Sequence, residues 1–379
     1  MLKSVYNLVK DKTPLPIMAV VYNLLQLNDT NILQTTNQGT YKFIKYDKTK
    51  LYPNLYGRYG LYRSVILNSD DEVVSFSPPK SISYGEFTER NLDNLIVQEL
   101  VEGTMINLFF DKEWQVATRN TIDKTSKFYK MFFDAAQENG LCLDKLETNL
   151  CYSFVLQHPN NVIVGPIQKP QLCLIAMYSI DKRTNVVTSH DIYDIETTCF
   201  FNETTIHLPQ KYEWAGYESL IDYYCSTNLQ FYKPGIVILN TETGERTKIR
   251  NTVYEQIKRL KGSRAKLQYQ YFCLRQKNQM DDFLKSYPEN TRSFLTFENE
   301  LHEFACSLYK NYASCYVKKE TKEIPPVFKT HMYNIHKIYK GQLKDQKKYV
   351  TRDVVVNYVN EMTPSSHMYT MSKYLPRKE

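Results

Sequence analysis

The feature that most constrains the fold is a change in the spacing of apolar residues along the chain. From Arg58 to Gly262 the sequence is mostly a series of short β-rich runs, several of which place an apolar residue at every second position. After Gly262, apolar residues recur three or four positions apart, as they do on the buried face of a helix. The change predicts a β-rich region followed by a helical region.

The β-rich region is predicted to be an α+β domain built on antiparallel sheet, because helical patterns interrupt the strand runs. These runs, bounded by Asn, Asp, Gly or Pro, are "YRSVILN", "EVVSFS", "MINLFFD", "WQVATRN", "CYSFVLQ", "NVIVGP", "QLCLIAMYSI" and "GIVILN". The segments "KFYKMFFDAAQENG" and "YESLIDYYCSTN" favour helices, and Gly140 suits the end of the first. An apolar stretch from Leu15 to Leu25 is predicted to be a core helix.

The predicted domains are residues 1–262, in which 1–50 form an N-terminal extension, and an all-helical domain of residues 263–379. Residues 263–379 carry 20 Lys and Arg and 12 Asp and Glu, a net charge of +8, so the whole excess of +7 lies there. This asymmetry favours a face that binds nucleic acid or another anion. A solvated helical surface would give the same counts, and charge alone does not separate the two.

Several classes of protein are excluded by what the sequence lacks. There is no apolar run of about 18 residues, so neither a membrane-spanning helix nor a membrane partner is expected. The N-terminal stretch lacks the small-residue cleavage site of a secretory leader, and the eight cysteines form no CxxC pair. We therefore predict an intracellular protein with reduced cysteines, no disulfides and no metal site.

Four segments carry the recognisable motifs. They are "YRSVILNSDDEVVSFSPPKSISYGEF", "LVEGT", "CYSFVLQHPNNVIVGP" and "KPGIVILNTETGERTKIRN". Together they resemble the covalent nucleotidyltransferases, specifically RNA ligases of the bacteriophage T4 RNA ligase 1 type, and most closely relatives of that group in large DNA viruses. The resemblance covers the chain from about Arg58 onward. It implies a nucleotidyltransferase domain followed by a helical domain.

The second segment aligns with the family motif Lys-x-Asp/Glu-Gly, in which the lysine attacks the α-phosphate of ATP and the acid contacts the ribose. Glu102 and Gly103 match the last two positions, but Leu100 stands in the place of the lysine. An isobutyl group has no lone pair and cannot attack phosphorus. The resemblance therefore implies a non-catalytic remnant of an active site with no catalytic residue.

The other segments imply a nucleotide-binding set and two missing acids. The cations that match the family's phosphate-binding positions are Arg63, Lys80, Lys248 and Arg250, and Glu102 completes the set. The family's strand glutamate has no counterpart at Ser153, Val155 or Gln157, and Pro234 replaces a second glutamate that helps organise metal. Because Mg²⁺ requires oxygen ligands, we predict no metal ligands here.

The helical region carries the predicted RNA contacts. These are Lys337, Lys340, Lys344, Lys347, Lys348 and Arg352. Tyr309, Tyr312, Tyr316, Tyr333 and Tyr339 are interleaved with lysines and are predicted to lie mostly in the core. His331 and His336 are five positions apart and are predicted to be helix-surface or RNA-facing residues, not metal ligands.

The sequence thus predicts an RNA ligase-like protein that has a degenerate active site and binds RNA. Whether the former active-site pocket also binds a nucleotide is left open. One alternative is an active ligase or nucleotidyltransferase that uses ATP and Mg²⁺ and recruits another lysine, of which Lys80 is the nearest in the motifs. A second alternative is a virion or assembly component that keeps only the fold. If the protein is viral, its location is the cytoplasm of an infected host cell.

Overall fold

The computed structural model describes residues 19–24, 29, 31–91, 93–194, 198–213, 216–217, 219–220, 231–262, 266–320 and 323–375. The chain divides into two compact units, Met1–Glu255 and Gln256–Glu379. The division falls inside helix α5 (Thr252–Lys261), earlier than the predicted boundary at 262/263. The reason is that Ile257 and Leu260 of this helix already pack against the core of the second unit.

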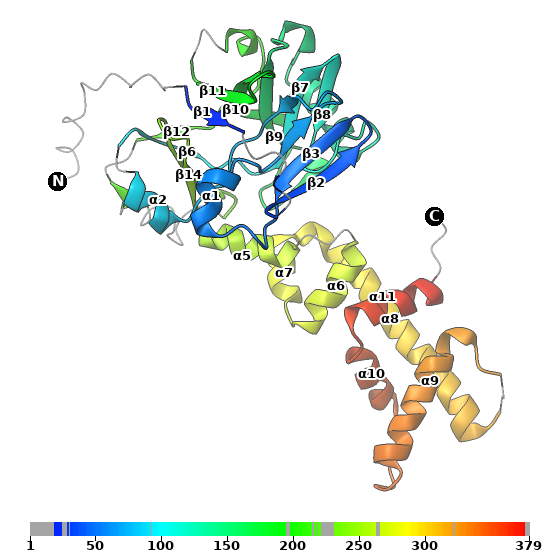
Figure 1. The fold of residues 1–379 in the computed structure, drawn as a ribbon. Coiled ribbons are helices and arrows are strands. Elements are labelled where there is room, and N and C mark those ends of the chain that lie inside the picture. The colour runs from blue at the N-terminus through cyan, green and yellow to red at the C-terminus, as the bar shows by residue number, and fades with distance from the viewer. Residues whose placement is uncertain are drawn as a thin grey trace. The chain divides into compact units, whose positions relative to one another are not determined.

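The first unit contains three sheets in which every strand pair is antiparallel (Figure 1). The largest sheet has the order β1 (Val21–Asn23), β11 (Val186–His190), β10 (Gln171–Asp181), β9 (Leu150–Gln157), β7 (Thr104–Asp111) and β8 (Glu113–Ala117). The second has the order β12 (Lys211–Tyr212), β6 (Leu95–Glu99), β13 (Gly235–Asn240) and β14 (Arg246–Arg250). The third has the order β2 (Leu33–Gln38), β3 (Tyr41–Tyr46), β4 (Val65–Leu67) and β5 (Val73–Ser75). The predicted α+β class is confirmed.

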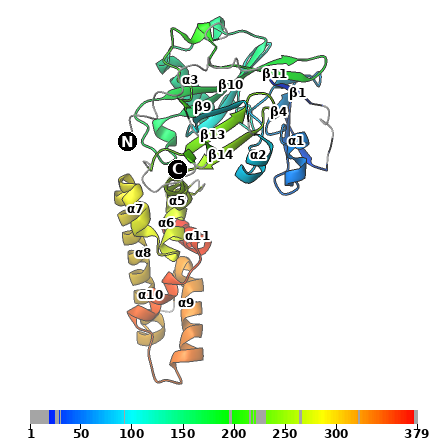
Figure 2. The same ribbon diagram turned by 90° about the vertical axis from the view of Figure 1, so that its left-hand side faces the viewer.

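Helices cover the outer faces of two of these sheets. The described α-helices of this unit, apart from the start of α5, are α1 (Tyr56–Tyr59), α2 (Tyr84–Arg90) and α3 (Lys127–Glu138), with 3-10 turns at Pro53–Leu55, Leu143–Lys145, Pro159–Asn161 and Cys199–Phe201. Helix α3 lies over β9 and β10 (Figure 2) and buries Phe132 against Phe154. It begins after Ser126, whose Oγ accepts a hydrogen bond from the Tyr129 N–H (3.2 Å), and Gly140 follows it at a φ of 71°, as predicted.

Alternation along β9 defines an inner face of the largest sheet. Phe154 and its neighbours on the same side pack toward α3, whereas Cys151 packs toward the third sheet with Phe43 and Phe109. Because successive side chains of a strand point to opposite faces, the positions two, four and six residues after Cys151 share this inner side. The second sheet is covered on its other side by α2, through Phe87.

Two sequence predictions are wrong in this unit. The predicted core helix from Leu15 to Leu25 contains strand β1 instead, and its remaining residues lie largely outside the described part of the chain. Val20, Tyr22 and Leu24 are buried while the residues between them are exposed, which is a strand period. The run "NVIVGP" is a loop, because the Val164 N–H donates to a side chain instead of a neighbouring strand. The predicted helix "YESLIDYYCSTN" lies mostly outside the described residues.

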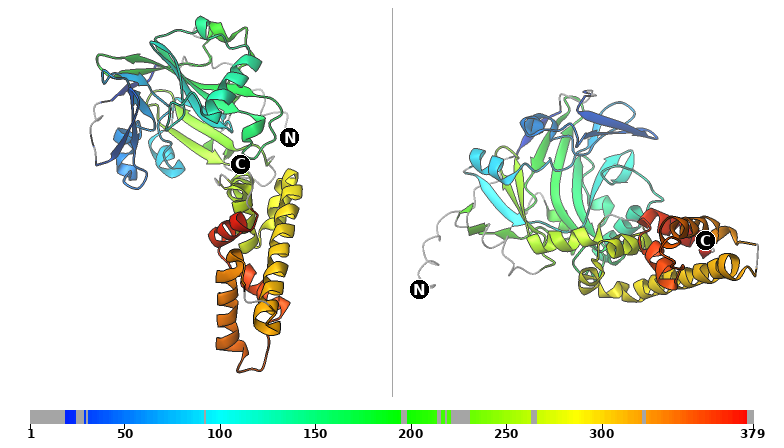
Figure 3. Two further views of the ribbon diagram at one scale, coloured as in Figure 1. Left: turned by 90° about the vertical axis from the view of Figure 1, so that its right-hand side faces the viewer. Right: turned by 90° about the horizontal axis from the view of Figure 1, so that it is seen from below.

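The second unit is helical, as predicted. Its helices after α5 are α6 (Leu267–Gln276), α7 (Met280–Ser286), α8 (Thr291–Tyr312), α9 (Pro326–Ile338), α10 (Arg352–Asn360) and α11 (Pro364–Tyr374), with a 3-10 turn at Pro288–Asn290. π-Helical turns extend α8 over Ala313–Lys318 and α9 over Tyr339–Leu343. Helices α8 and α9 lie side by side (Figure 3, left, yellow and orange) around Phe304, Met332 and Ile335. No helix in the described ranges is both long and apolar enough to cross a membrane.

Candidate functional site

Leu100 lies one residue beyond strand β6, beside the start of β13. Its backbone N–H donates to the carbonyl of Gly235 (3.1 Å), which continues the strand pairing by one step. Ile96 and Gln98 point from β6 toward the space between the first two sheets, and alternation puts Leu100 on the same side. The position at which the family has its lysine thus borders the space between the first two sheets, but it holds the half-buried side chain of Leu100.

Glu102 is held by backbone amides. Its Oε1 accepts a hydrogen bond from the Val164 N–H at 2.7 Å, and its two oxygens lie 3.3 and 3.2 Å from the Gly165 nitrogen. Only 8% of the residue is exposed. The carboxylate therefore ties the loop after β9 to the start of β7. It also lines a cavity of about 510 Å³, together with Gln157, Pro234 and residues of the loop after β9.

Gly103 is required by the close approach of two strands. Its φ is 149°, and a Cβ there would lie 2.5 Å from both the Leu156 carbonyl oxygen and the Val155 Cγ1. Any side chain would therefore force β7 and β9 apart. The Glu-Gly pair that carries the family resemblance has a structural role in this chain, whatever it binds.

The positions where the family has acids hold residues with other partners. The Ser153 Oγ donates to Asn107 Oδ1 (2.9 Å), and the Gln157 side-chain amide donates to the Glu102 carbonyl (2.8 Å). Val155 packs against Gly103, and Pro234 precedes β13. Across the described residues, no three His, Cys, Asp or Glu side chains are grouped so that they could hold a metal ion. These residues therefore offer no all-protein metal site, whereas Mg²⁺ in phosphoryl-transfer sites commonly binds through one or two carboxylates together with substrate phosphates.

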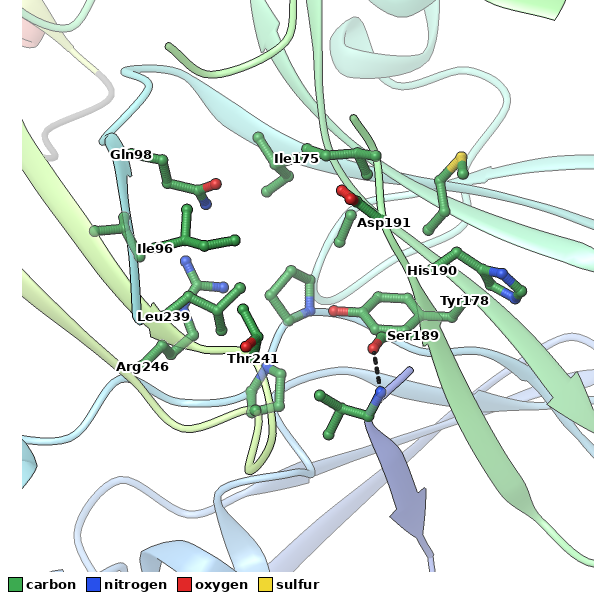
Figure 4. A pocket seen from close by; sticks show the side chains of 18 of the residues that line it. Ile96, Gln98, Ile175, Tyr178, Ser189, His190, Asp191, Leu239, Thr241 and Arg246 are labelled. Atoms are coloured by element: carbon green, nitrogen blue, oxygen red, sulfur yellow. Dashed lines mark hydrogen bonds between the residues drawn. The ribbon is translucent and has the colours of Figure 1, made fainter. Parts of the chain in front are cut away.

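A cavity of about 80 Å³ lies between the first two sheets, and Arg246 points into it (Figure 4). Ile96, Gln98 and Ile175 form part of its wall. The Nε of Arg246 is buried and has no hydrogen-bond partner among the described residues. Ligand pockets usually measure roughly 300–1,000 Å³, so this space suits a small anion or water better than a whole nucleotide.

Arg63 lies close enough to Arg246 for the two guanidinium groups to repel each other. Burial, reinforced by Arg246, lowers the pKa of Arg63 to about 10, and burial lowers the pKa of Arg246 as well. In the described part of the chain, neither guanidinium forms an ion pair with a carboxylate. Sequence reasoning missed Arg246, although it lies on the same strand face as Lys248 and Arg250, two and four residues before them.

The remaining predicted nucleotide-binding cations are only partly brought together. The Lys80 Nζ lies 3.5 Å from the centroid of the Tyr56 ring and donates to the Ser81 carbonyl (3.3 Å). Lys248 is half-buried on β14, whereas the exposed Arg250 is ion-paired with Glu255. Arg246 and Arg250 are four residues apart on an extended strand, which separates them by roughly 13 Å. Glu102 lies beyond the Arg250 end, so the predicted set does not form one compact site.

The predicted RNA contacts of the second unit are exposed. Lys337 lies on α9, Lys340 in its π-helical extension and Lys344 directly after it, and Lys347 and Lys348 lie in the segment before α10. No ion pair with a carboxylate is found for these lysines among the residues that the structure describes. Arg352 differs, because its Nη2 contacts His302 Nε2 (2.8 Å) and Cys306 Sγ (3.0 Å) on α8.

Most of the interleaved aromatic residues lie in the core, as predicted. Tyr312 is buried, with its hydroxyl 3.1 Å from His336 Nδ1, and Tyr309 and Tyr339 pack against the same core. The prediction for His331 is wrong. Its two ring nitrogens lie 2.9 and 3.1 Å from the hydroxyls of Tyr358 and Thr370, so it is an internal residue, and burial lowers its pKa.

Comparisons with known proteins return nucleic-acid ligases. No protein-family model matches the chain. A stretch of 99 residues is 25% identical to an RNA ligase of Rhodothermus phage RM378, and this match covers 22% of the chain and 23% of that relative's length. Among solved structures, the chain is similar to an archaeal ATP-dependent RNA ligase (13% identity over 71% of this chain and 72% of that chain, TM-score 0.42). It is also similar to a variant of the Naegleria gruberi RNA ligase solved with ATP and Mn (15% identity over 48% of this chain and 58% of that chain, TM-score 0.37).

Proposed function

We propose that the chain is an RNA ligase-like protein that binds RNA and does not transfer a nucleotide. The observation that carries the proposal is Leu100, a hydrocarbon side chain at the position where the family's lysine attacks ATP. The 99-residue similarity to a phage RNA ligase supports the relationship. The cations at the family's phosphate-binding positions are present, but the lysine nucleophile is not.

Lys80, the lysine nearest in the motifs, is engaged elsewhere, whereas Lys169 and Lys233 line the cavity beside Glu102 without matching a motif position. The Lys80 ammonium lies on the Tyr56 ring and donates to a carbonyl, so it would have to give up both contacts before it could act as a nucleophile. Phosphoryl transfer also requires charge neutralisation, usually by a metal ion, and Pro234 stands where the resemblance implies a glutamate that helps organise that metal. An active enzyme that recruited Lys80 would therefore need a rearranged site.

The second unit supports the RNA-binding part of the proposal. Its exposed lysines can approach phosphates without first breaking internal ion pairs. Lysines that neutralise phosphates release counterions, which gives affinity that is independent of sequence and falls steeply with salt. A protein that kept the fold only as an assembly component would show no such affinity.

Binding of a phosphate group in the inner cavity is the second candidate, and Arg246, which lines the cavity with Arg63 nearby, favours it. Two partly buried guanidinium groups without carboxylate partners would each be stabilised by a nearby anion. Since the cavity is only about 80 Å³, we expect pyrophosphate to bind there at least as tightly as ATP. Isothermal titration with both ligands, on the protein and on Arg246→Gln, tests this candidate.

The test of RNA binding is a salt titration. Fluorescence anisotropy with labelled RNA would compare the protein with a variant in which Lys344, Lys347, Lys348 and Arg352 are Ala. Each lost phosphate contact should lower the slope of log affinity against log salt by roughly 0.7 to 0.9, equally across RNA sequences. Lys285→Ala and Lys318→Ala are matched controls, because these lysines are paired with Asp282 and Glu320. Unchanged affinity and slope in the fourfold variant would show that these cations form a solvated surface and do not contact RNA.

A further inference from the structure

We propose that one face of α9 binds single-stranded RNA, with Tyr333 stacking on a base and lysines on both sides contacting phosphates. We call this face the α9 stripe; it consists of Lys329, Tyr333, Lys337, Lys340 and Lys344. The inference rests on the proposed RNA binding. It adds the form of RNA that is recognised and a residue that recognises it.

The α9 stripe is continuous because of its spacing. Lys329, Tyr333 and Lys337 are four residues apart on α9, which places them one above another, and Lys340 and Lys344 continue the stripe in the π-helical extension and directly after it. All five are exposed, while the opposite side of α9 buries Phe328, Met332 and Ile335. Residues 324–344 contain no Asp or Glu, so no acid of this segment interrupts the positive charge.

Tyr333 presents a free aromatic ring. It is 68% exposed, and within the described ranges no aromatic ring or cation covers it. Tyr369 on α11 provides the contrast, since it is 63% exposed but the Lys373 Nζ lies 4.2 Å from its ring centroid. An exposed tyrosine ring between lysines offers a stacking surface and phosphate contacts at once.

The chemistry of the α9 stripe favours a single strand over a duplex. A tyrosine ring can stack only on a base that is not already stacked within a helix, and side chains cannot read the deep, narrow major groove of duplex RNA. From Lys329 to Lys344 the face is roughly 20 Å long at about 1.5 Å per residue. That length can follow the backbone of a short single-stranded segment.

The experiment compares Tyr333→Ala with Tyr369→Ala in the full chain. Anisotropy with a labelled oligouridine should show that Tyr333→Ala lowers the affinity by about 5- to 150-fold, which is the range for one stacked base, and leaves the salt slope unchanged. Tyr333→Trp should retain the affinity, and Tyr369→Ala should change it by less than about twofold. A duplex RNA of the same length should bind all four proteins with equal affinity.

The outcomes separate this inference from the proposed function. If Tyr333→Ala binds oligouridine like the parent while Lys337→Ala, Lys340→Ala and Lys344→Ala together weaken binding, stacking is refuted and RNA binding stands. Equal loss of duplex and single-strand affinity in Tyr333→Ala would also refute stacking. If the parent protein binds neither RNA at moderate salt, the proposed function fails first. Because Tyr333 is exposed, its variants should keep the parent's thermal unfolding midpoint.

Discussion

The inner side of the β-rich unit and the α9 stripe both carry charged residues, but these residues have different partners. On the inner side, Glu102 is bound by backbone amides, Arg250 by Glu255, and Lys80 by the Tyr56 ring, whereas Arg63 and Arg246 have no carboxylate partner among the described residues. On the stripe, lysines such as Lys337 and Lys340 reach solvent with no carboxylate partner among the described residues. A charged group with an internal partner contributes mainly to folding, whereas an exposed group without one is available to bind.

The largest effect is expected where the Glu-Gly motif serves the fold. Gly103→Ala should lower the free energy of unfolding by about 3 kcal/mol, because its Cβ would collide with the backbone of β9. Gly85→Ala is the matched control: Gly85 lies in α2 with nothing near its Cβ position, so stability should stay equal or rise by under about 1 kcal/mol. Denaturant unfolding measures both. A Gly103→Ala protein as stable as the parent would remove the structural explanation of the motif.

The next effect compares one charge of the inner side with three charges of the α9 stripe. Glu102→Ala should cost about 2 kcal/mol of stability, since the amides of Val164 and Gly165 lose a charged acceptor. Its affinity for RNA should not change. Replacing Lys337, Lys340 and Lys344 with Ala should do the reverse, with a stability change of no more than about 0.5 kcal/mol and weaker RNA binding. If Glu102→Ala weakened RNA binding while leaving stability intact, the two regions would not differ in the way described.

The smallest effect is expected from restoring the lysine alone. Leu100→Lys should give at most weak adenylate formation and no ligation, because neither Val155 nor Pro234 supplies the acids that the family has there. A gel assay for joined RNA ends measures ligation. Ligation at an efficiency near that of the family would show that a metal site survives in another arrangement.

The parts of the fold that could be predicted from sequence depend on local patterns. Strands such as β9 and β13 and helices such as α3 and α8 have apolar spacing that is visible within one segment. The loop after β9 could not be predicted, because its amides bond to Glu102, about sixty residues earlier in the chain. Strand β1 could not be recognised either, since three residues of a short apolar stretch show too little of a period.

The candidate site was predictable in its residue types but not in its geometry. That Leu100 stands where the resemblance implies a lysine is evident from the motif alone. The cavity around Arg246 depends on how β6, β10 and β14 pack, and those strands are far apart in the chain. The partners of Lys80 and Arg250 likewise result from packing that a motif does not encode.

The most direct test of the central claim is the intact mass of the protein after incubation with ATP or GTP and Mg²⁺. The mass should stay unchanged, because Leu100 cannot form a phosphoramidate bond and Lys80, the lysine nearest in the motifs, is held on the Tyr56 ring. An acid-resistant, Mg²⁺-dependent increase equal to one AMP or GMP, mapped to any lysine, would contradict the claim. It would show that this protein is an active nucleotidyltransferase with a recruited nucleophile.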